Sequence, residues 1–253
     1  MTGPDPLLTG HLALVTGASR NLGAEIAHAM AAAGARVVVN YRSSRQAALD
    51  VLARLPGSGH IAVGADAASA DGVDSLVTES ERLTGQVIDI LVNNAGPFSM
   101  TPYADLDPAE FDLIWNTNVR AAYLAARRTA PGMIGAGWGR IVNISAGSAY
   151  LRNHSVYSLA KDATITLTEQ LAVELGPNVL VNCVAPGQIL ESAQDMAAFD
   201  DGFVARTTAR TPAGRLATRA DVAGVVVALC SPAFGMVTGA TVPVDGGARL
   251  PIG

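Results

Sequence analysis

Short apolar runs rich in β-branched residues alternate with longer helical patterns along nearly the whole chain. The expected strands are Leu12–Thr16, Arg36–Asn40, His60–Ala65, Ile88–Asn93, Arg140–Ile144, Val179–Val184 and Thr241–Val244. The expected helices lie near Leu22–Ala33, Gln46–Leu55, Gly72–Arg82, Asn118–Ala130, Val156–Leu175 and Arg219–Leu229. Strands that are apolar on both faces, separated by helices of crossover length, indicate a parallel sheet covered on both sides. We expect a single α/β domain over residues 1–253, with a doubly wound, Rossmann-type sheet of about seven strands.

Composition excludes several classes of protein. Of the 253 residues, 49% are hydrophobic and 15% charged, and the net charge is -5, which excludes intrinsic disorder. The 17 Lys and Arg against 22 Asp and Glu offer no basic footprint for a nucleic acid. No apolar run approaches the length of about 18 residues needed to span a membrane. The 2 cysteines match no metal motif, and Met1–Thr9 lacks the pattern of a signal peptide. We expect a cytoplasmic protein without a metal, nucleic-acid or membrane partner.

One segment interrupts the alternation. Gln188–Arg215 is polar, lacks a strand and precedes the last helix. Long irregular segments in compact domains commonly serve as functional lids or are disordered. We expect a flexible substrate lid at residues 188–215.

The turn Thr16–Gly23 joins the first strand to the first helix. Glycines at such a turn let the main chain approach a pyrophosphate, and the helix N-terminus supplies N–H donors and a positive dipole. A plain strand-to-helix turn would also need one of the glycines, so the position in a parallel-sheet pattern strengthens the signal. The turn therefore predicts a dinucleotide-binding loop.

The end of the second strand bears on the choice of cofactor. It runs through Asn40, Tyr41, Arg42, Ser43 and Ser44 without an acidic residue. A carboxylate there would bind the adenosine ribose hydroxyls and repel a 2′-phosphate. Arg42, the two serines and Arg20 offer cations and donors instead, although both arginines could simply be solvated. This composition favours NADP(H) over NAD(H).

Tyr157 and Lys161 stand four residues apart in a helical pattern, so both side chains lie on one face of the helix. A phenol with a pKa near 10 is a poor acid–base catalyst at neutral pH. A neighbouring ammonium stabilises the phenolate and lowers that pKa, which prepares the hydroxyl for proton exchange with a carbonyl or alcohol. Lys161 is also the sole lysine of the sequence. The pair is therefore the candidate acid–base centre.

With these residues the chain resembles the short-chain dehydrogenase/reductase family over nearly its full length. The matching pieces, in the order of the family, are Thr16–Gly23, Asp66, Asn93–Gly96, Asn118-Val119, Tyr157–Lys161, Pro186-Gly187 and Val244–Gly247. The resemblance implies that Tyr157 acts as general acid in ketone reduction and that Lys161 also holds the nicotinamide ribose. Asn118 would anchor a water that links Lys161 to solvent, and a serine after the fifth strand would polarise the substrate carbonyl.

The motifs and the resemblance together assign a set of residues to the cofactor. These are Gly17, Ser19, Arg20, Asn21, Leu22, Gly23, Asn40, Tyr41, Arg42, Ser43, Asp66, Ala67, Asn94, Ala95, Gly96, Tyr157, Lys161, Pro186, Gly187 and Ile189.

The sequence departs from the family pattern at two places. Asn21 replaces the usual middle glycine of the loop, and asparagine is among the few residues that tolerate a left-handed backbone. The family places its serine thirteen residues before the tyrosine, where this chain has Ile144. Ser145 is the nearest candidate and Ser148 the second, whereas an ungapped match puts Ala146 at the site. The catalytic serine is therefore assigned to Ser145, with Ser148 or no serine as alternatives.

Two branches of the family compete. Thr211–Arg215 and Val237–Thr241 resemble 3-oxoacyl-thioester reductases, whereas Arg20–Gly23, Tyr41–Ser44 and Pro186–Leu190 are similar to pteridine reductases. We expect an NADPH-dependent reductase of a 3-oxoacyl thioester or related ketone, with a pteridine reductase as the first alternative. A non-catalytic dinucleotide-binding scaffold or sensor is the alternative from another class. The resemblance further implies a homotetramer that acts on a small-molecule carbonyl or alcohol.

Overall fold

A seven-stranded parallel sheet forms the centre of the molecule, with the strand order β3-β2-β1-β4-β5-β6-β7. The computed structural model describes residues 7–150, 155–197 and 200–250. The strands are β1 (Leu12–Val15), β2 (Arg36–Tyr41), β3 (Ile61–Gly64), β4 (Ile90–Asn93), β5 (Gly139–Ile144), β6 (Val179–Pro186) and β7 (Thr241–Val244). Because the order reverses between β1 and β4, the sheet is doubly wound in the Rossmann manner, as the sequence predicts.

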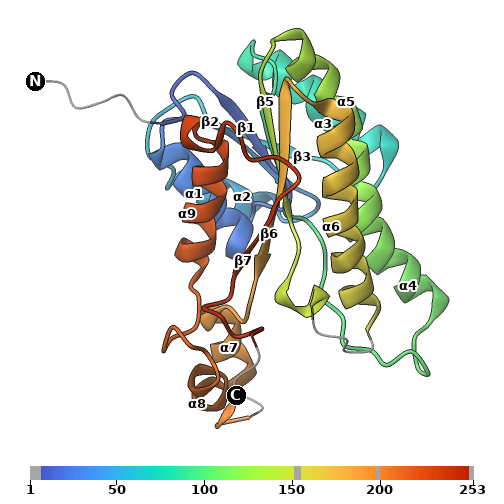
Figure 1. The fold of residues 1–253 in the computed structure, drawn as a ribbon. Coiled ribbons are helices and arrows are strands. Elements are labelled where there is room, and N and C mark those ends of the chain that lie inside the picture. The colour runs from blue at the N-terminus through green and yellow to red at the C-terminus, as the bar shows by residue number, and fades with distance from the viewer. Residues whose placement is uncertain (1–6, 151–154, 198–199, 251–253) are drawn as a thin grey trace, which may run out of the picture.

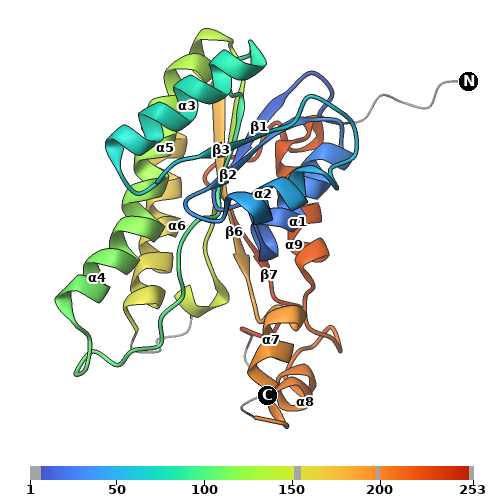
Figure 2. The ribbon, with the colours of Figure 1, turned by 180° about the vertical axis from the view of Figure 1, so that it is seen from behind.

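Helices cover both faces of this sheet, so the fold has three layers in a single domain (Figures 1 and 2). The α-helices are α1 (Asn21–Ala32), α2 (Arg45–Leu52), α3 (Ala70–Thr84), α4 (Pro108–Trp115), α5 (Ala121–Gly135), α6 (Val156–Leu175), α7 (Leu190–Ala197), α8 (Phe203–Ala209) and α9 (Arg219–Cys230). Helices α1, α2 and α9 lie on one side, and α3, α5 and α6 lie on the other.

The alternation of side chains along each strand fills two hydrophobic cores. In β1, Ala13 and Val15 face the core under α1 and α9, whereas Leu12 and Leu14 face the core under α3 and α5. All four are fully buried. Burial on both faces explains why these strands appear in the sequence as unbroken apolar runs.

The structure adds helices that the sequence analysis did not predict. Helix α4 begins after Asp107, whose carboxylate accepts a hydrogen bond from Ala109 N at 2.7 Å. A π-helical turn, Asn116–Arg120, then joins α4 to α5, where one helix over Asn118–Ala130 was expected. Segment 188–215 also contains α7 and α8, so the expectation of an irregular stretch was wrong in this respect.

No helix in the described part of the chain is both long enough and apolar enough to cross a membrane.

Helices α7 and α8 lie beyond the carboxyl ends of β6 and β7 (Figure 1). This is the edge at which open parallel sheets bind their ligands.

Candidate active site

A cavity of about 620 Å³ runs across the loops that follow the carboxyl ends of the strands. Every residue that the sequence analysis assigned to the dinucleotide lines this cavity. We call the part around Gly17–Gly23 and Asn40–Ser43 the phosphate end, and the part around Phe98, Ser145 and Tyr157 the carbonyl end. The structure thus brings together residues that are far apart in the sequence.

The turn at the phosphate end has the backbone expected of a phosphate loop. Gly17 has a φ of +63° and Asn21 a φ of +51°, so the expected left-handed tolerance of Asn21 is used. A Cβ at Gly23 would lie 2.5 Å from Gly17 O, which leaves room only for glycine. Helix α1 begins at Asn21 and directs its N-terminal dipole toward the cavity. This arrangement fits a bound pyrophosphate.

Two asparagine side chains hold this loop in place. Asn40 is buried, and its Oδ1 accepts a hydrogen bond from Gly17 N at 3.2 Å while its Nδ2 donates to Ala65 O at 3.2 Å. Asn94 Nδ2 donates to Thr16 O at 3.0 Å, and Asn94 N donates to Thr16 Oγ1 at 3.0 Å. The loops after β1, β2, β3 and β4 are therefore joined before any ligand binds.

Arg20 and Arg42 bring positive charge to the phosphate end, and Asp66 is a carboxylate that lines the same cavity. Arg20 and Arg42 are exposed and line the cavity with Ser43 and Ser44. Neither guanidinium forms an ion pair with another described residue. Free arginines and hydroxyls suit a phosphate dianion. The residues present therefore fit a phosphorylated dinucleotide.

Helix α6 positions the candidate acid–base pair. Ser155 caps it by accepting a hydrogen bond from Ser158 N, which satisfies a donor of the first turn. Tyr157 then lies in the first turn and Lys161 one turn later, with Lys161 Nζ 5.5 Å from the centre of the Tyr157 ring. Lys161 is buried and its Nζ donates to Ile144 O at 2.8 Å. The helix therefore presents both groups to the cavity from one face.

Burial governs the proton affinities of this pair. It raises the pKa of the Tyr157 phenol to about 12 and lowers the pKa of the Lys161 ammonium to about 8. The sequence analysis expected the ammonium to lower the phenol pKa, and in this structure loss of solvation dominates instead. Lys161 therefore carries its positive charge at neutral pH and loses its proton as the pH rises through about 8.

The hydroxyl of Ser145 is engaged within the protein. Ser145 is buried, lines the cavity, and donates from Oγ to Lys161 O at 2.7 Å. Ala146 also lines the cavity, whereas Ser148 does not. The Oγ of Ser148 is buried without a partner. Ser145 remains the predicted serine, and it must release Lys161 O in order to donate to a substrate.

Asn118 lies behind the cavity wall. It sits in the π-helical turn, is buried, and donates from Nδ2 to Ile114 O at 3.0 Å and to Pro97 O at 3.3 Å. Its Oδ1 has no partner and leaves no room for a Cβ at Gly96. Single π turns inside helices often mark functional positions. Asn118 thus keeps a buried acceptor free next to the site.

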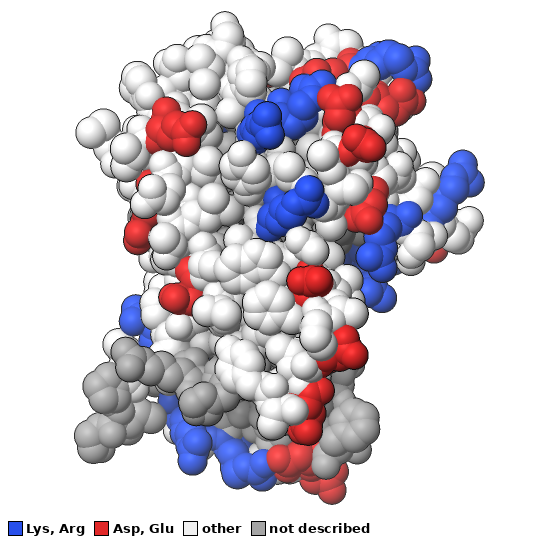
Figure 3. Space-filling view, turned by 90° about the vertical axis from the view of Figure 1, so that its right-hand side faces the viewer, with Lys and Arg blue, Asp and Glu red and all other residues white. Residues whose placement is uncertain are grey.

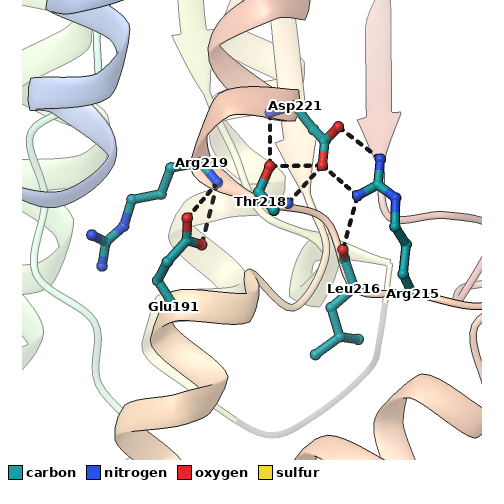
Figure 4. Close-up of polar contacts among 6 residues, drawn as sticks. All are labelled: Glu191, Arg215, Leu216, Thr218, Arg219 and Asp221. Atoms are coloured by element: carbon teal, nitrogen blue, oxygen red, sulfur yellow. Dashed lines mark hydrogen bonds and ion pairs between the residues drawn. The ribbon is translucent and has the colours of Figure 1, made fainter.

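The two ends of the expected lid are fastened together (Figure 4). Glu191 of α7 accepts hydrogen bonds from Arg219 N at the start of α9, at 3.3 Å for each carboxylate oxygen. Arg215 donates to both oxygens of Asp221 at 2.6 and 2.8 Å, and Asp221 forms a capping box with Thr218. These bonds hold the pKa of the Asp221 carboxyl well below its usual range. These bonds therefore join α7 and the turn before α9 to the start of α9.

Several residues that line the cavity escaped the sequence analysis. They are Ala65, Ala68, Pro97, Phe98, Leu113, Thr117, Ala121, Ile144 and Ser192. Phe98 is 63% exposed, and its ring centre lies 4.9 Å from that of Tyr157 in an edge-to-face arrangement. The one available signal was its place two residues after the motif Asn93–Gly96.

Comparison with known proteins agrees with this geometry. A family model described as enoyl-(acyl carrier protein) reductase matches residues 17–249. The chain is 39% identical to L-xylulose reductase from Bos taurus, covering 96% of this chain and 98% of that one. It is 36% identical to versicolorin reductase 1 from Aspergillus parasiticus, covering 95% and 97%.

A solved structure of a gluconate 5-dehydrogenase from Burkholderia cenocepacia, in complex with NADP and tartrate, superposes with a TM-score of 0.90. The sequence identity is 30%, and the match covers 98% of this chain and 99% of that one. The chain is an NAD(P)-dependent oxidoreductase that acts on alcohol and carbonyl groups. It belongs to the short-chain dehydrogenase/reductase family.

Proposed function

We propose that the protein is an NADPH-dependent reductase whose substrate is a 3-oxoacyl thioester or a related ketone. The observation that carries the proposal is the single cavity that joins Arg42 and Ser43 to Tyr157 and Lys161. Unpaired arginine and serine side chains at one end select a 2′-phosphate. A phenol and an ammonium at the other end serve a carbonyl.

The bound cofactor supplies a hydride to the carbonyl carbon. Tyr157 donates its phenolic proton to the carbonyl oxygen, which becomes the hydroxyl of the product. Lys161 stabilises the phenolate that remains, and burial makes this support necessary because it disfavours the phenolate. Ser145 donates to the carbonyl oxygen as negative charge develops there. Asn118, with its free Oδ1, orients the water through which Tyr157 recovers a proton from solvent.

Turnover by a Tyr157→Phe variant tests this assignment. We expect Tyr157→Phe still to bind NADPH while kcat falls about 10²–10⁴-fold, because general acid catalysis is lost. A panel of small ketones, 3-oxoacyl thioesters and dihydropteridines would be followed by NADPH absorbance. Tyr123→Phe, on the exposed side of α5, is the matched control and should leave kcat unchanged.

Two results would contradict the proposal. If neither the unmutated protein nor Tyr157→Phe consumes NADPH although both bind it, the chain is a dinucleotide-binding scaffold or sensor. If dihydropteridines alone are reduced, the protein is a pteridine reductase.

The proposal extends to a lid over the substrate. Segment 188–215 carries Ser192 and Ile189 to the cavity wall, and its base is fixed by the bonds of Glu191 and Asp221. Substrate binding should then slow amide hydrogen exchange in this segment. A cytoplasmic location remains an expectation.

We also propose that the protein is a homotetramer. Thr164, Thr168 and Leu171 of α6 are buried against the rest of the same chain. A subunit interface on α6 would therefore use the other, exposed side chains of this helix. Leu159 and Val173 of α6 are exposed to 43% and 87%, and wide areas of the face formed by α4, α5 and α6 are uncharged (Figure 3). Light scattering should give four times the mass of 25.8 kDa, and a monomer would contradict the proposal.

A further inference from the structure

Phe98 is an exposed aromatic side chain at the reacting end of the cavity. It lines the cavity, is 63% exposed, and packs edge-to-face against Tyr157 with an angle of 78° between the rings. Aromatic rings contribute through the apolar area that they bury and through ring geometry. A large part of the Phe98 ring is left without a protein neighbour. A substrate held by Tyr157 would therefore lie within reach of it.

The polar residues that follow Phe98 in its loop are attached to two helices. Ser99 and Thr101 both donate hydroxyl hydrogen bonds to Glu110 Oε1, at 2.6 and 2.7 Å. Pro102 forms an antiparallel bridge with Ser155, the residue that caps α6. The loop is thus fastened to α4 and to the start of the helix that bears Tyr157. The backbone that follows Phe98 is consequently anchored beside the site.

The neighbouring described walls are also poor in polar partners. Pro97, Ala146 and Ile189 line the cavity with Phe98 and offer no side-chain hydrogen bond. Ser145 and Tyr157 are committed to the carbonyl oxygen in the proposed reaction. Thr117 Oγ1 donates to Leu113 O at 2.6 Å, which leaves Ser192 of α7 as a further hydroxyl. A polyhydroxylated chain placed here would lose water without regaining equivalent hydrogen bonds, which is costly. An apolar group makes no hydrogen bonds with water, so it would lose none on binding here.

We infer that Phe98 selects carbonyl substrates that carry a flat or apolar group beside the carbonyl, and disfavours polyhydroxylated ketones. The inference rests on the proposed ketone reduction and names the substrate class for that site. The names of two similar proteins, L-xylulose reductase and gluconate 5-dehydrogenase, indicate polyhydroxylated substrates for those proteins. The inferred preference of this chain is different.

The test uses three carbonyl compounds with NADPH. 1-Phenyl-1,2-propanedione and 2,3-butanedione differ by a phenyl group in place of a methyl group, and L-xylulose is polyhydroxylated. We expect kcat/KM for the phenyl compound to exceed that for 2,3-butanedione by about tenfold, the upper range of a ring contact. L-Xylulose should be the poorest of the three.

Phe98→Ala should remove the advantage of the phenyl compound, so that kcat/KM for this compound falls about tenfold more than kcat/KM for 2,3-butanedione does. Phe98→Leu should retain part of the advantage. Met100→Ala is the matched control, because Met100 is 67% exposed on the same loop and does not line the cavity. It should change neither substrate.

A binding measurement separates this inference from the proposed function. Calorimetric titration of 1-phenyl-1,2-propanedione into Tyr157→Phe with NADPH should give a Kd about tenfold lower than in the double variant with Phe98→Ala. Rapid reduction of L-xylulose, or equal effects of Phe98→Ala on both diketones, would overturn the inference and leave the reductase proposal intact. Binding without any reduction by the unmutated protein would overturn the reductase proposal, and the inference with it.

Discussion

At the phosphate end of the cavity, asparagine side chains hold the main chain, whereas at the carbonyl end a few side chains from loops form the walls. The side chains of Asn40 and Asn94 join the loops of four neighbouring strands through hydrogen bonds to backbone atoms. Ser145 and Tyr157 instead depend on the seating of α6 against β5. The phosphate end therefore tolerates little change, and the carbonyl end is where substrate choice can vary.

The largest effect that would sharpen this contrast concerns the two serines. Ser145→Ala should lower kcat about 10²-fold, the usual loss for one donor to a developing oxyanion. Ser148→Ala is the control and should leave kcat within about twofold, because Ser148 does not line the cavity. Steady-state kinetics with NADPH measure both. A loss in Ser148→Ala alone would move the donor to that residue.

The pH dependence of reduction tests the ammonium at the carbonyl end. Burial lowers the pKa of Lys161 to about 8, so its charge is present below that pH and lost above it. The neutral amine no longer supports the buried phenolate, and kcat/KM should fall about tenfold per pH unit above pH 8. Rates measured from pH 6 to 10 check this. A profile flat to pH 10 would show that Lys161 keeps its proton.

At the phosphate end, Arg42→Ala should weaken NADPH binding about tenfold while NADH binding stays unchanged, since a charge-assisted bond to the 2′-phosphate is lost. Arg45→Ala is the matched control, because Arg45 is exposed on α2 and does not line the cavity. Titration calorimetry with each cofactor measures the effect. Equal weakening of both cofactors would remove Arg42 from the 2′-phosphate site.

The smallest effect concerns stability away from both ends. Asp221→Asn should lower the free energy of unfolding by about 1–2 kcal/mol through loss of the cap, with the exposed ion pair adding little. Because the pKa of Asp221 is lowered on folding, its contribution is present above pH ~4 and is lost as pH falls through the folded value. Urea unfolding at pH 7 and pH 3 measures it, with exposed Asp112→Asn as control. A loss as large at pH 3 would contradict the linkage.

The sheet and the phosphate end were largely predictable because both depend on local pattern. Buried parallel strands such as β1 and β5 appear as apolar runs, and the turn Thr16–Gly23 needs its glycines for local backbone reasons. Helix α4 was missed because no periodic apolar pattern was recognised in this short segment, although Asp107 followed by Pro108 is typical of a helix start.

The carbonyl end was less predictable because it depends on distances between loops. Spacing alone left Ser145, Ser148 and Ala146 open, and only the structure shows that Ser145 donates to Lys161 O. The direction of the Tyr157 pKa shift depends on burial, which a sequence pattern does not measure. Phe98 carried no motif that would distinguish it from other residues of an exposed loop.

The hydrogen bonds from Arg219 N to the Glu191 carboxylate join α7 to the start of α9, and this has a consequence for how the substrate scope of the enzyme can change. Glu191 joins the start of the insert to α9, and Ala213 N donates to Gly246 O after β7 at 3.0 Å, so we expect changes of length to be tolerated only between these two anchors. We expect an exchange of the stretch between these anchors to change substrate scope while the sheet stays intact.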